Sequence, residues 1–239
     1  MVMMEFLEYP NSDILLARLV QSQDSGPSKV ELPPIRVSEV PGEEFLNRLA
    51  EKVGMQSHDL FLVAGLTIPD DALHFDEAAS RELPELVQRA LSLPAPSRQR
   101  LRDHAGSLAE MPRADSPRGK RPFEQYPPGF GSLLVRMLAL RNLGWSSAAK
   151  VMYLMSGVYV SAATIGAVGR GAKELDAELL GGFAAVLGIP VAVLASLTGM
   201  GEVAAGRTQP AETTDAAALL WDVRHLTAAQ VRQVSHLAD

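Results

Sequence analysis

The chain has 239 residues, of which 47% are hydrophobic and 21% are charged, and its net charge is −6. This composition is typical of a globular protein, and the length allows two small domains. The absence of cysteine excludes disulfides and thiolate chemistry and fits a reducing compartment. Because acidic residues stand near the N-terminus, where a secretory signal needs a basic region, we expect a cytoplasmic protein.

The first half, residues 1–110, is predicted to form a helical domain with a role in assembly or regulation. Its first helix is expected over Ser12 to Gln21, where apolar residues recur at helical spacing. Residues 23–40 are rich in proline, and the helical pattern resumes at Glu43. The first half carries 18 acidic residues and 10 Lys or Arg, a net charge of −8.

A segment of the first half is similar to a segment of the second half. Residues 49–66 (LAEKVGMQSHDLFLVAGL) align without a gap with residues 183–200 (FAAVLGIPVAVLASLTGM), which matches Gly54 with Gly188. A weaker match continues downstream with a shift of one residue. A repeat of this kind predicts two related helical units. The stretch 23–40 is too short for two of the helices expected in the second unit, so the first copy is predicted to be incomplete.

Residues 111–130 are predicted to be a basic linker between the halves, because proline and glycine are dense there. Residues 111–173 contain nine Lys or Arg and two acidic residues, which gives this stretch a net charge of +7. This local charge is compatible with a nucleic-acid surface and equally with ordinary solvated charges. Electrostatic cover of this basic stretch by the acidic first half is a further hypothesis.

The second half, residues 131–239, shows a series of short helices. The first begins near Leu133, and the second follows a cap at Ser146 or Ser147 and ends at Gly157. Ser161 is expected to cap a short third helix that ends at Gly169. Two more helices are expected over residues 176–187 and 191–197, and one or two over 213–239, with Trp221 in the core.

Two stretches without charge, residues 151–169 and 179–201, are long enough to cross a bilayer. Buried helices are the better interpretation, because Gly188 and Pro190 interrupt the second stretch. The segment aligned with that second stretch also carries polar residues, among them His58 and Asp59, which we interpret as a water-exposed face. We therefore expect no contact with a membrane.

Residues 131–200 resemble the lambda-repressor/Cro type (XRE-like) of helix-turn-helix transcriptional regulator, particularly its actinobacterial forms. The landmarks are Leu133-Leu134 and Arg141 in the first helix, Gly157-Val158 at the turn, Ser161, Thr164 and Ile165 in the recognition helix, and Arg170-Gly171 after it. The resemblance implies an all-α fold of two related five-helix units, the first without a full helix-turn-helix. It also implies a DNA-binding transcriptional regulator with double-stranded DNA as its partner.

In such a fold the recognition helix enters the major groove and nearby cations hold phosphates. Carried over by position, the residues facing DNA would be Tyr159, Ser161, Ala162, Ala163 and Thr164. The phosphate contacts would be Lys150, Arg170 and Lys173, with Arg118, Lys120 and Arg121 on a basic arm. Because Ser161 and Thr164 are the only hydrogen-bonding side chains of the recognition helix, we expect binding dominated by phosphates, with modest specificity.

The sequence does not suggest an enzyme. Its five histidines are scattered and form no metal-ligand pair, and no nucleophile motif is present, so we expect no metal and no cofactor. The alternative function is a non-catalytic adaptor built on degenerate helix-turn-helix domains. A second copy of the chain or another regulatory protein would then be its partner.

Overall fold

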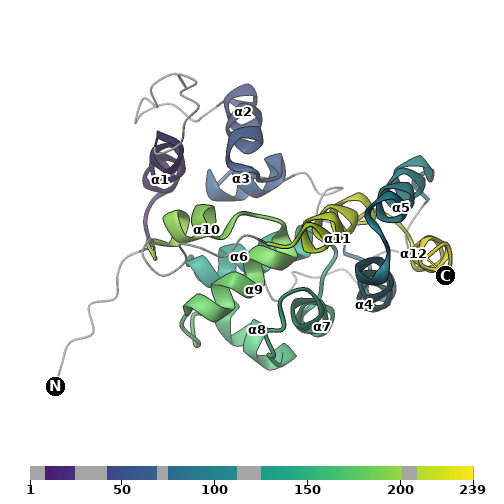
Figure 1. The fold of residues 1–239 in the computed structure, drawn as a ribbon. Helices are drawn as coiled ribbons and strands as arrows, with labels where there is room; N and C mark the ends of the chain where they lie inside the picture. Colours follow the sequence, from purple (N-terminus) through teal and green to yellow (C-terminus); the bar gives the residue numbers. More distant parts are fainter. Residues whose placement is uncertain (1–8, 25–41, 69–74, 112–124, 201–208, 239) are drawn as a thin grey trace.

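The computed structural model describes residues 9–24, 42–68, 75–111, 125–200 and 209–238. These residues form twelve α-helices and contain no strand, which confirms the predicted all-α fold class (Figure 1). The helices of the first half are α1 (Ser12–Asp24), α2 (Glu43–Val53), α3 (Ser57–Val63), α4 (Glu77–Ser92) and α5 (Ala95–Ser107). Those of the second half are α6 (Phe130–Leu140), α7 (Trp145–Ser156), α8 (Ala162–Gly169), α9 (Ala177–Leu187), α10 (Val191–Thr198), α11 (Ala211–Asp222) and α12 (Ala228–His236).

The two segments that align in the sequence have similar local structures. Gly54 ends α2 and Gly188 ends α9, and both have a φ of +68°, a conformation that favours glycine. Leu60 of α3 and Leu194 of α10 are both fully buried. The division of the whole chain into two repeat units remains a prediction, because residues 25–41, where the first copy is predicted to lack helices, lie outside the described residues.

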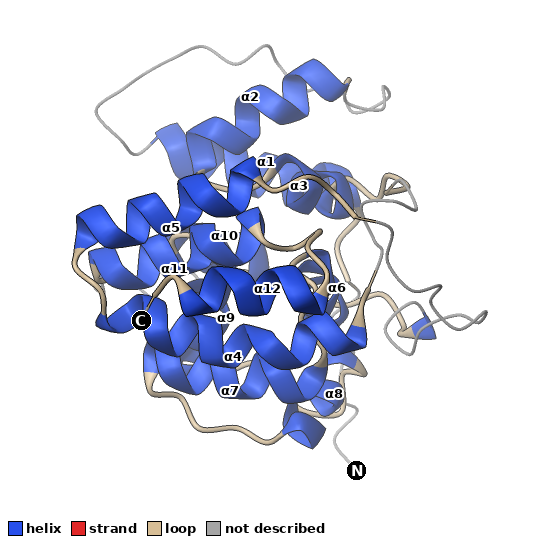
Figure 2. Ribbon diagram, turned by 90° about the vertical axis from the view of Figure 1, so that its right-hand side faces the viewer, coloured by secondary structure: helices blue, strands red, loops and turns tan. Residues whose placement is uncertain are grey.

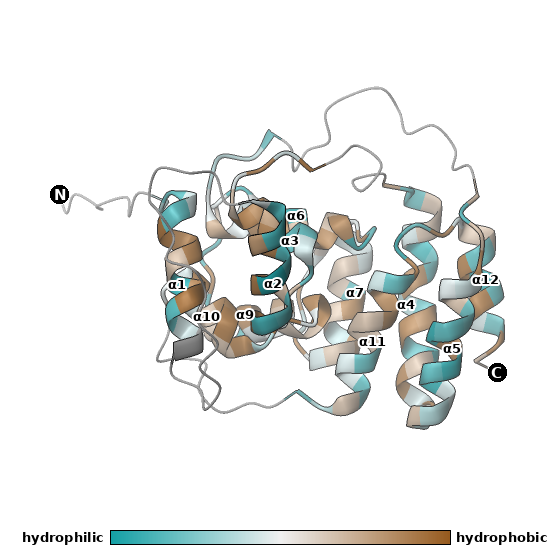
Figure 3. Cartoon of the chain, turned by 90° about the horizontal axis from the view of Figure 1, so that it is seen from above, coloured by the Kyte–Doolittle hydropathy of each residue, from teal (hydrophilic) through white to brown (hydrophobic). Residues whose placement is uncertain are grey.

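The helices of the two halves pack against each other. Helix α1, the first of the first half, packs against α10 of the second half, and α6, the first of the second half, packs against α3 of the first half. Helix α4 lies along α12, and α5 packs against α11 (Figure 2). Buried apolar side chains from both halves belong to one continuous core, to which the mostly hydrophobic α9 and α10 contribute (Figure 3). The two halves are therefore packed together rather than held only by the linker between α5 and α6.

A buried ion pair joins α3 to the end of α6. The Arg141 guanidinium donates from Nη1 to Asp59 Oδ1 at 2.9 Å and from Nη2 to Asp59 Oδ2 at 2.7 Å. It also donates to the carbonyl oxygens of Met137 and Leu187, at 2.9 and 2.7 Å. Asp59 is 0% exposed and Arg141 is 1% exposed. The interpretation of Asp59 as part of a water-exposed face was therefore wrong, because its carboxylate is paired with an arginine 82 positions away.

Three further ion pairs cross between the halves nearer the surface. Their N–O distances are 2.8 Å for Arg98–Asp215, 2.7 Å for Arg102–Asp222 and 2.6 Å for Arg232–Glu82. In the first two pairs the first half supplies the cation and the second half the anion. In these two pairs, unlike Arg232–Glu82, the acidic residues of the first half therefore do not join it to the second.

Trp221 lies at the edge of the core rather than inside it, which differs from the prediction. The ring is half-buried, with the guanidinium carbons of Arg224 and Arg141 at 4.0 and 5.2 Å from its centroid. It lines a hollow of about 670 Å³ between α2, α3 and α11, together with Phe61 and His58.

None of the helices in the described part of the chain has the length and the apolar content needed to span a bilayer. The uncharged stretches noted in the sequence are divided among α7 to α10, each of which has 12 residues or fewer. Their apolar side chains contribute to the shared core.

Candidate nucleic-acid interface

Helices α7 and α8 occupy the segment that was predicted to be a helix-turn-helix. Helix α7 ends at Gly157, whose φ is +74°. Four residues later, the Ser161 side chain accepts a hydrogen bond from the Thr164 backbone N–H at 3.1 Å and so caps α8. The predicted cap of α8 at Ser161 and the predicted end of α7 at Gly157 are confirmed. The cap expected at Ser146 or Ser147 was wrong, because α7 already begins at Trp145, after Gly144 and without a side-chain cap.

Helix α8 is held in place by close contacts with α6 and α7. Its apolar residues Ile165 and Val168 are buried. At Gly131 in α6, an added Cβ would overlap the carbonyl oxygen of Val168. At Gly166, an added Cβ would lie 3.0 Å from the Trp145 ring of α7. Because neither glycine carries a side chain, the α6 backbone can approach that of α8 at Gly131, and the Trp145 ring can lie against the α8 backbone at Gly166.

The outer face of α8 and the loop before it are exposed. Tyr159 is 86% exposed, and its ring makes an edge-to-face contact with Tyr153 of α7, with centroids 6.1 Å apart. Ser161 and Ala163 are exposed, whereas Ala162 and Thr164 are half-buried. The structure therefore places all five residues predicted to face DNA on one short segment, from Tyr159 to Thr164.

The three predicted phosphate contacts of the second half are exposed, Arg170 and Lys173 just after α8 and Lys150 in the groove between α4 and α7. Lys150 projects from α7. The Arg170 guanidinium carbon is 5.9 Å from the centroid of the Trp145 ring, and Lys173 Nζ is 4.0 Å from an Asp176 carboxylate oxygen. Arg118, Lys120 and Arg121, predicted to form a basic arm, lie outside the described residues.

The Tyr126 ring packs against the C-terminal end of α8. The ring stacks on Trp145 with centroids 6.5 Å apart, and an added Cβ on Gly169 would lie 2.5 Å from it. Burial raises the pKa of the Tyr126 hydroxyl, and the nearby positive charge of Arg170 partly opposes this rise.

Because the pKa of folded Tyr126 is raised above 10, the folded protein binds the phenolic proton more tightly than the unfolded chain does. This contribution to stability is fully present below pH 10 and is lost as the pH rises through the higher pKa of the folded state. We therefore expect the free energy of unfolding to fall less steeply with rising pH above pH 10 in Tyr126→Phe than in the wild type. Urea titrations of both proteins between pH 8 and 11 measure this, and parallel curves would contradict it.

Helix α4 of the first half, which the sequence did not connect with this site, lies beside α7 on the side away from α8 (Figure 1). Ser80 Oγ accepts a hydrogen bond from the Gly144 N–H and lies 3.1 Å from Ser147 Oγ, so α4 contacts the first turn of α7. Before α4, the Asn142 side chain accepts from the Asp76 backbone N–H at 2.8 Å. No pattern in the sequence connects residues so far apart.

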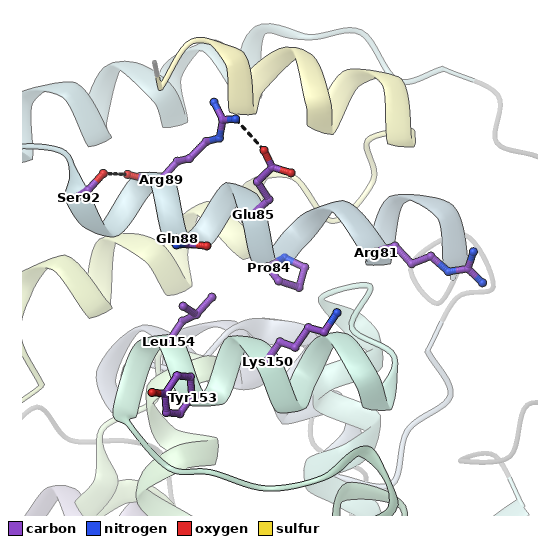
Figure 4. Close-up of a pocket in the computed structure, with 9 residues that line it drawn as sticks. All are labelled: Arg81, Pro84, Glu85, Gln88, Arg89, Ser92, Lys150, Tyr153 and Leu154. Atoms are coloured by element: carbon purple, nitrogen blue, oxygen red, sulfur yellow. Dashed lines mark hydrogen bonds and ion pairs between the residues drawn. The ribbon is translucent and has the colours of Figure 1, made fainter.

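A groove of about 780 Å³ lies between α4 and α7 (Figure 4). Its lining mixes charged, polar and apolar side chains, namely Arg81, Pro84, Glu85, Gln88, Arg89 and Ser92 from α4 and Lys150, Tyr153 and Leu154 from α7. Tyr153, which lines this groove, also contacts Tyr159 in the loop before α8.

In the described ranges, no three His, Cys, Asp or Glu side chains gather in a way that could hold a metal ion. Comparison of the chain with protein-family models, with curated proteins and with solved structures gave no match.

Proposed function

We propose that the chain is a DNA-binding transcriptional regulator that contacts the duplex through α7 and α8. The observation that carries the proposal is the position of α8. The helix is capped at Ser161, is backed by α6 and α7, and presents its first turn to solvent. In helix-turn-helix proteins the second helix of the pair meets base edges in the major groove with its N-terminal residues.

The side chains on this surface favour phosphate contacts over base readout. Ser161 and Thr164 can donate and accept hydrogen bonds, but their hydroxyls already lie 3.0 Å from each other. Ala163 can contact a thymine methyl group. The exposed cations Lys150, Arg170 and Lys173 supply the attraction to phosphates, and the exposed acids Glu174, Asp176 and Glu178 reduce it. We therefore expect measurable affinity mainly at low salt.

The test is binding of the full-length chain to a pool of mixed duplex fragments over a range of salt concentrations. The full chain is needed because both halves contribute to one core. We expect affinity that falls steeply as salt rises, together with enrichment of some fragments.

Replacing Lys150 and Lys173 together with glutamine is expected to reduce the slope of log affinity against log salt by up to about 2, since each neutralised phosphate contributes about 0.9. The matched control is Arg48→Gln on α2, which removes an exposed cation far from this surface along the chain. An unchanged slope in the double variant would show that these lysines are not phosphate contacts.

The exposed pair Tyr153 and Tyr159 favours the second candidate function, a protein-interaction adaptor. Tyr153 is 55% exposed and Tyr159 is 86% exposed, and aromatic side chains are enriched where proteins associate. Absence of DNA binding even at low salt would reject the regulator and make the adaptor the leading function.

A further inference from the structure

We propose that the DNA-binding surface extends from the helix-turn-helix onto α4 of the first half, where Arg81 contacts the phosphate backbone of the duplex. This inference rests on the proposed function. It assigns to the first half a direct part in DNA binding, in addition to the packing role that its helices already have.

The first argument is the register of α4 against α7. The contacts of Ser80 with Gly144 and Ser147 place the first turns of the two helices side by side. The helices then run in the same direction along the groove, from Arg81 and Lys150 at one end to Ser92 and Leu154 at the other (Figure 4). Arg81 therefore lies at the level of the α7 N-terminus, and in a helix-turn-helix this first helix of the pair crosses the DNA backbone.

The second argument is the spacing of the three helices. Helix α7 contacts both α8 and α4 and lies between them (Figure 1). Because packed helices are about 8–10 Å apart, α4 stands roughly 16–20 Å from α8. The major groove is about 12 Å wide. With α8 in the groove, the strand that borders it lies roughly 10–14 Å from the axis of α4, and an extended arginine side chain on α4 covers most of that distance.

The third argument is the availability of the Arg81 side chain. Its side chain is 72% exposed, and its partner is Glu77, one turn earlier on the same helix and 70% exposed. A pair this exposed is weak, so the guanidinium can exchange Glu77 for a phosphate, with which it forms charge-assisted hydrogen bonds. Arg89, in the same groove, is less available, because its side chain is 26% exposed and donates to Glu85 at 2.7 Å.

The experiment measures DNA affinity of the full-length chain between 50 and 200 mM salt on a mixed-sequence duplex. Arg81→Gln is expected to reduce the slope of log affinity against log salt by about 0.9, the contribution of one phosphate contact. Glu77→Gln, which removes the competing carboxylate, is expected to raise the affinity at low salt.

The matched controls are Arg48→Gln and Glu44→Gln. Arg48 and Glu44 form an equivalent exposed pair one turn apart on α2, with an N–O distance of 3.5 Å. Both control variants should follow the wild-type line. If the wild type binds DNA but Arg81→Gln has the same slope as Arg48→Gln, the extension to α4 is wrong and the proposed function stands. If the wild type does not bind, both fall together.

Discussion

Replacing Asp59 with alanine is expected to lower the free energy of unfolding by about 3–5 kcal/mol, the usual cost of removing one partner of a buried ion pair. The variant leaves the Arg141 guanidinium buried without its carboxylate. The carbonyl oxygens of Met137 and Leu187 then remain as its hydrogen-bond acceptors, and the Trp221 ring remains beside it. Because the pair joins α3 to α6, the loss should be seen in the cooperative unfolding of the whole chain in urea.

The control removes both charges, as in the double variant Asp59→Leu with Arg141→Met. Apolar replacement of a buried ion pair is often neutral or stabilising. We therefore expect the double variant to be more stable than Asp59→Ala and close to the wild type. A loss below about 1 kcal/mol in Asp59→Ala would match an exposed pair and would contradict the buried geometry.

Replacing Gly131 with alanine is expected to displace α8 and to weaken DNA binding together with stability. The added methyl group would overlap the carbonyl oxygen of Val168, and backbone atoms cannot move aside as a flexible side chain can. Inserting a carbon into a packed site typically costs about 1–3 kcal/mol. The free energy of unfolding in urea and the DNA affinity at low salt are the two measurements.

Gly181→Ala is the matched control for this substitution. Gly181 lies within α9, and nothing stands within 4 Å of the position of an added Cβ. Alanine at an open helical position is expected to stabilise the protein by roughly 0.5–1 kcal/mol, because it restricts the unfolded chain. DNA affinity should stay at the wild-type level. If Gly131→Ala behaved like Gly181→Ala, the close contact between α6 and α8 would not hold α8 in place.

The candidate site was predictable from the sequence as far as its signals are local. Gly157 marks the end of α7 and Ser161 marks the start of α8 because a left-handed glycine and a capping serine act within one helical turn. The resemblance to helix-turn-helix regulators implied the exposed positions of Lys150 and Tyr159. The neighbouring α4 was not predictable, because Ser80 and Ser147 are 67 positions apart and neither residue type indicates its partner.

The sequence by itself determined the all-α class, the local helix boundaries around Gly157 and Ser161, and the similarity of the two helix pairs whose first helices end at Gly54 and Gly188. Periodicity and capping are properties of a few consecutive residues, and packing did not override them here. Only the tertiary structure decided that Asp59 is buried against Arg141 and that Trp221 stays near the surface. A lone aspartate on a short helix is typical of a solvated face. The Asp59 carboxylate can be buried because folding brings the Arg141 guanidinium within hydrogen-bonding distance of both of its oxygens.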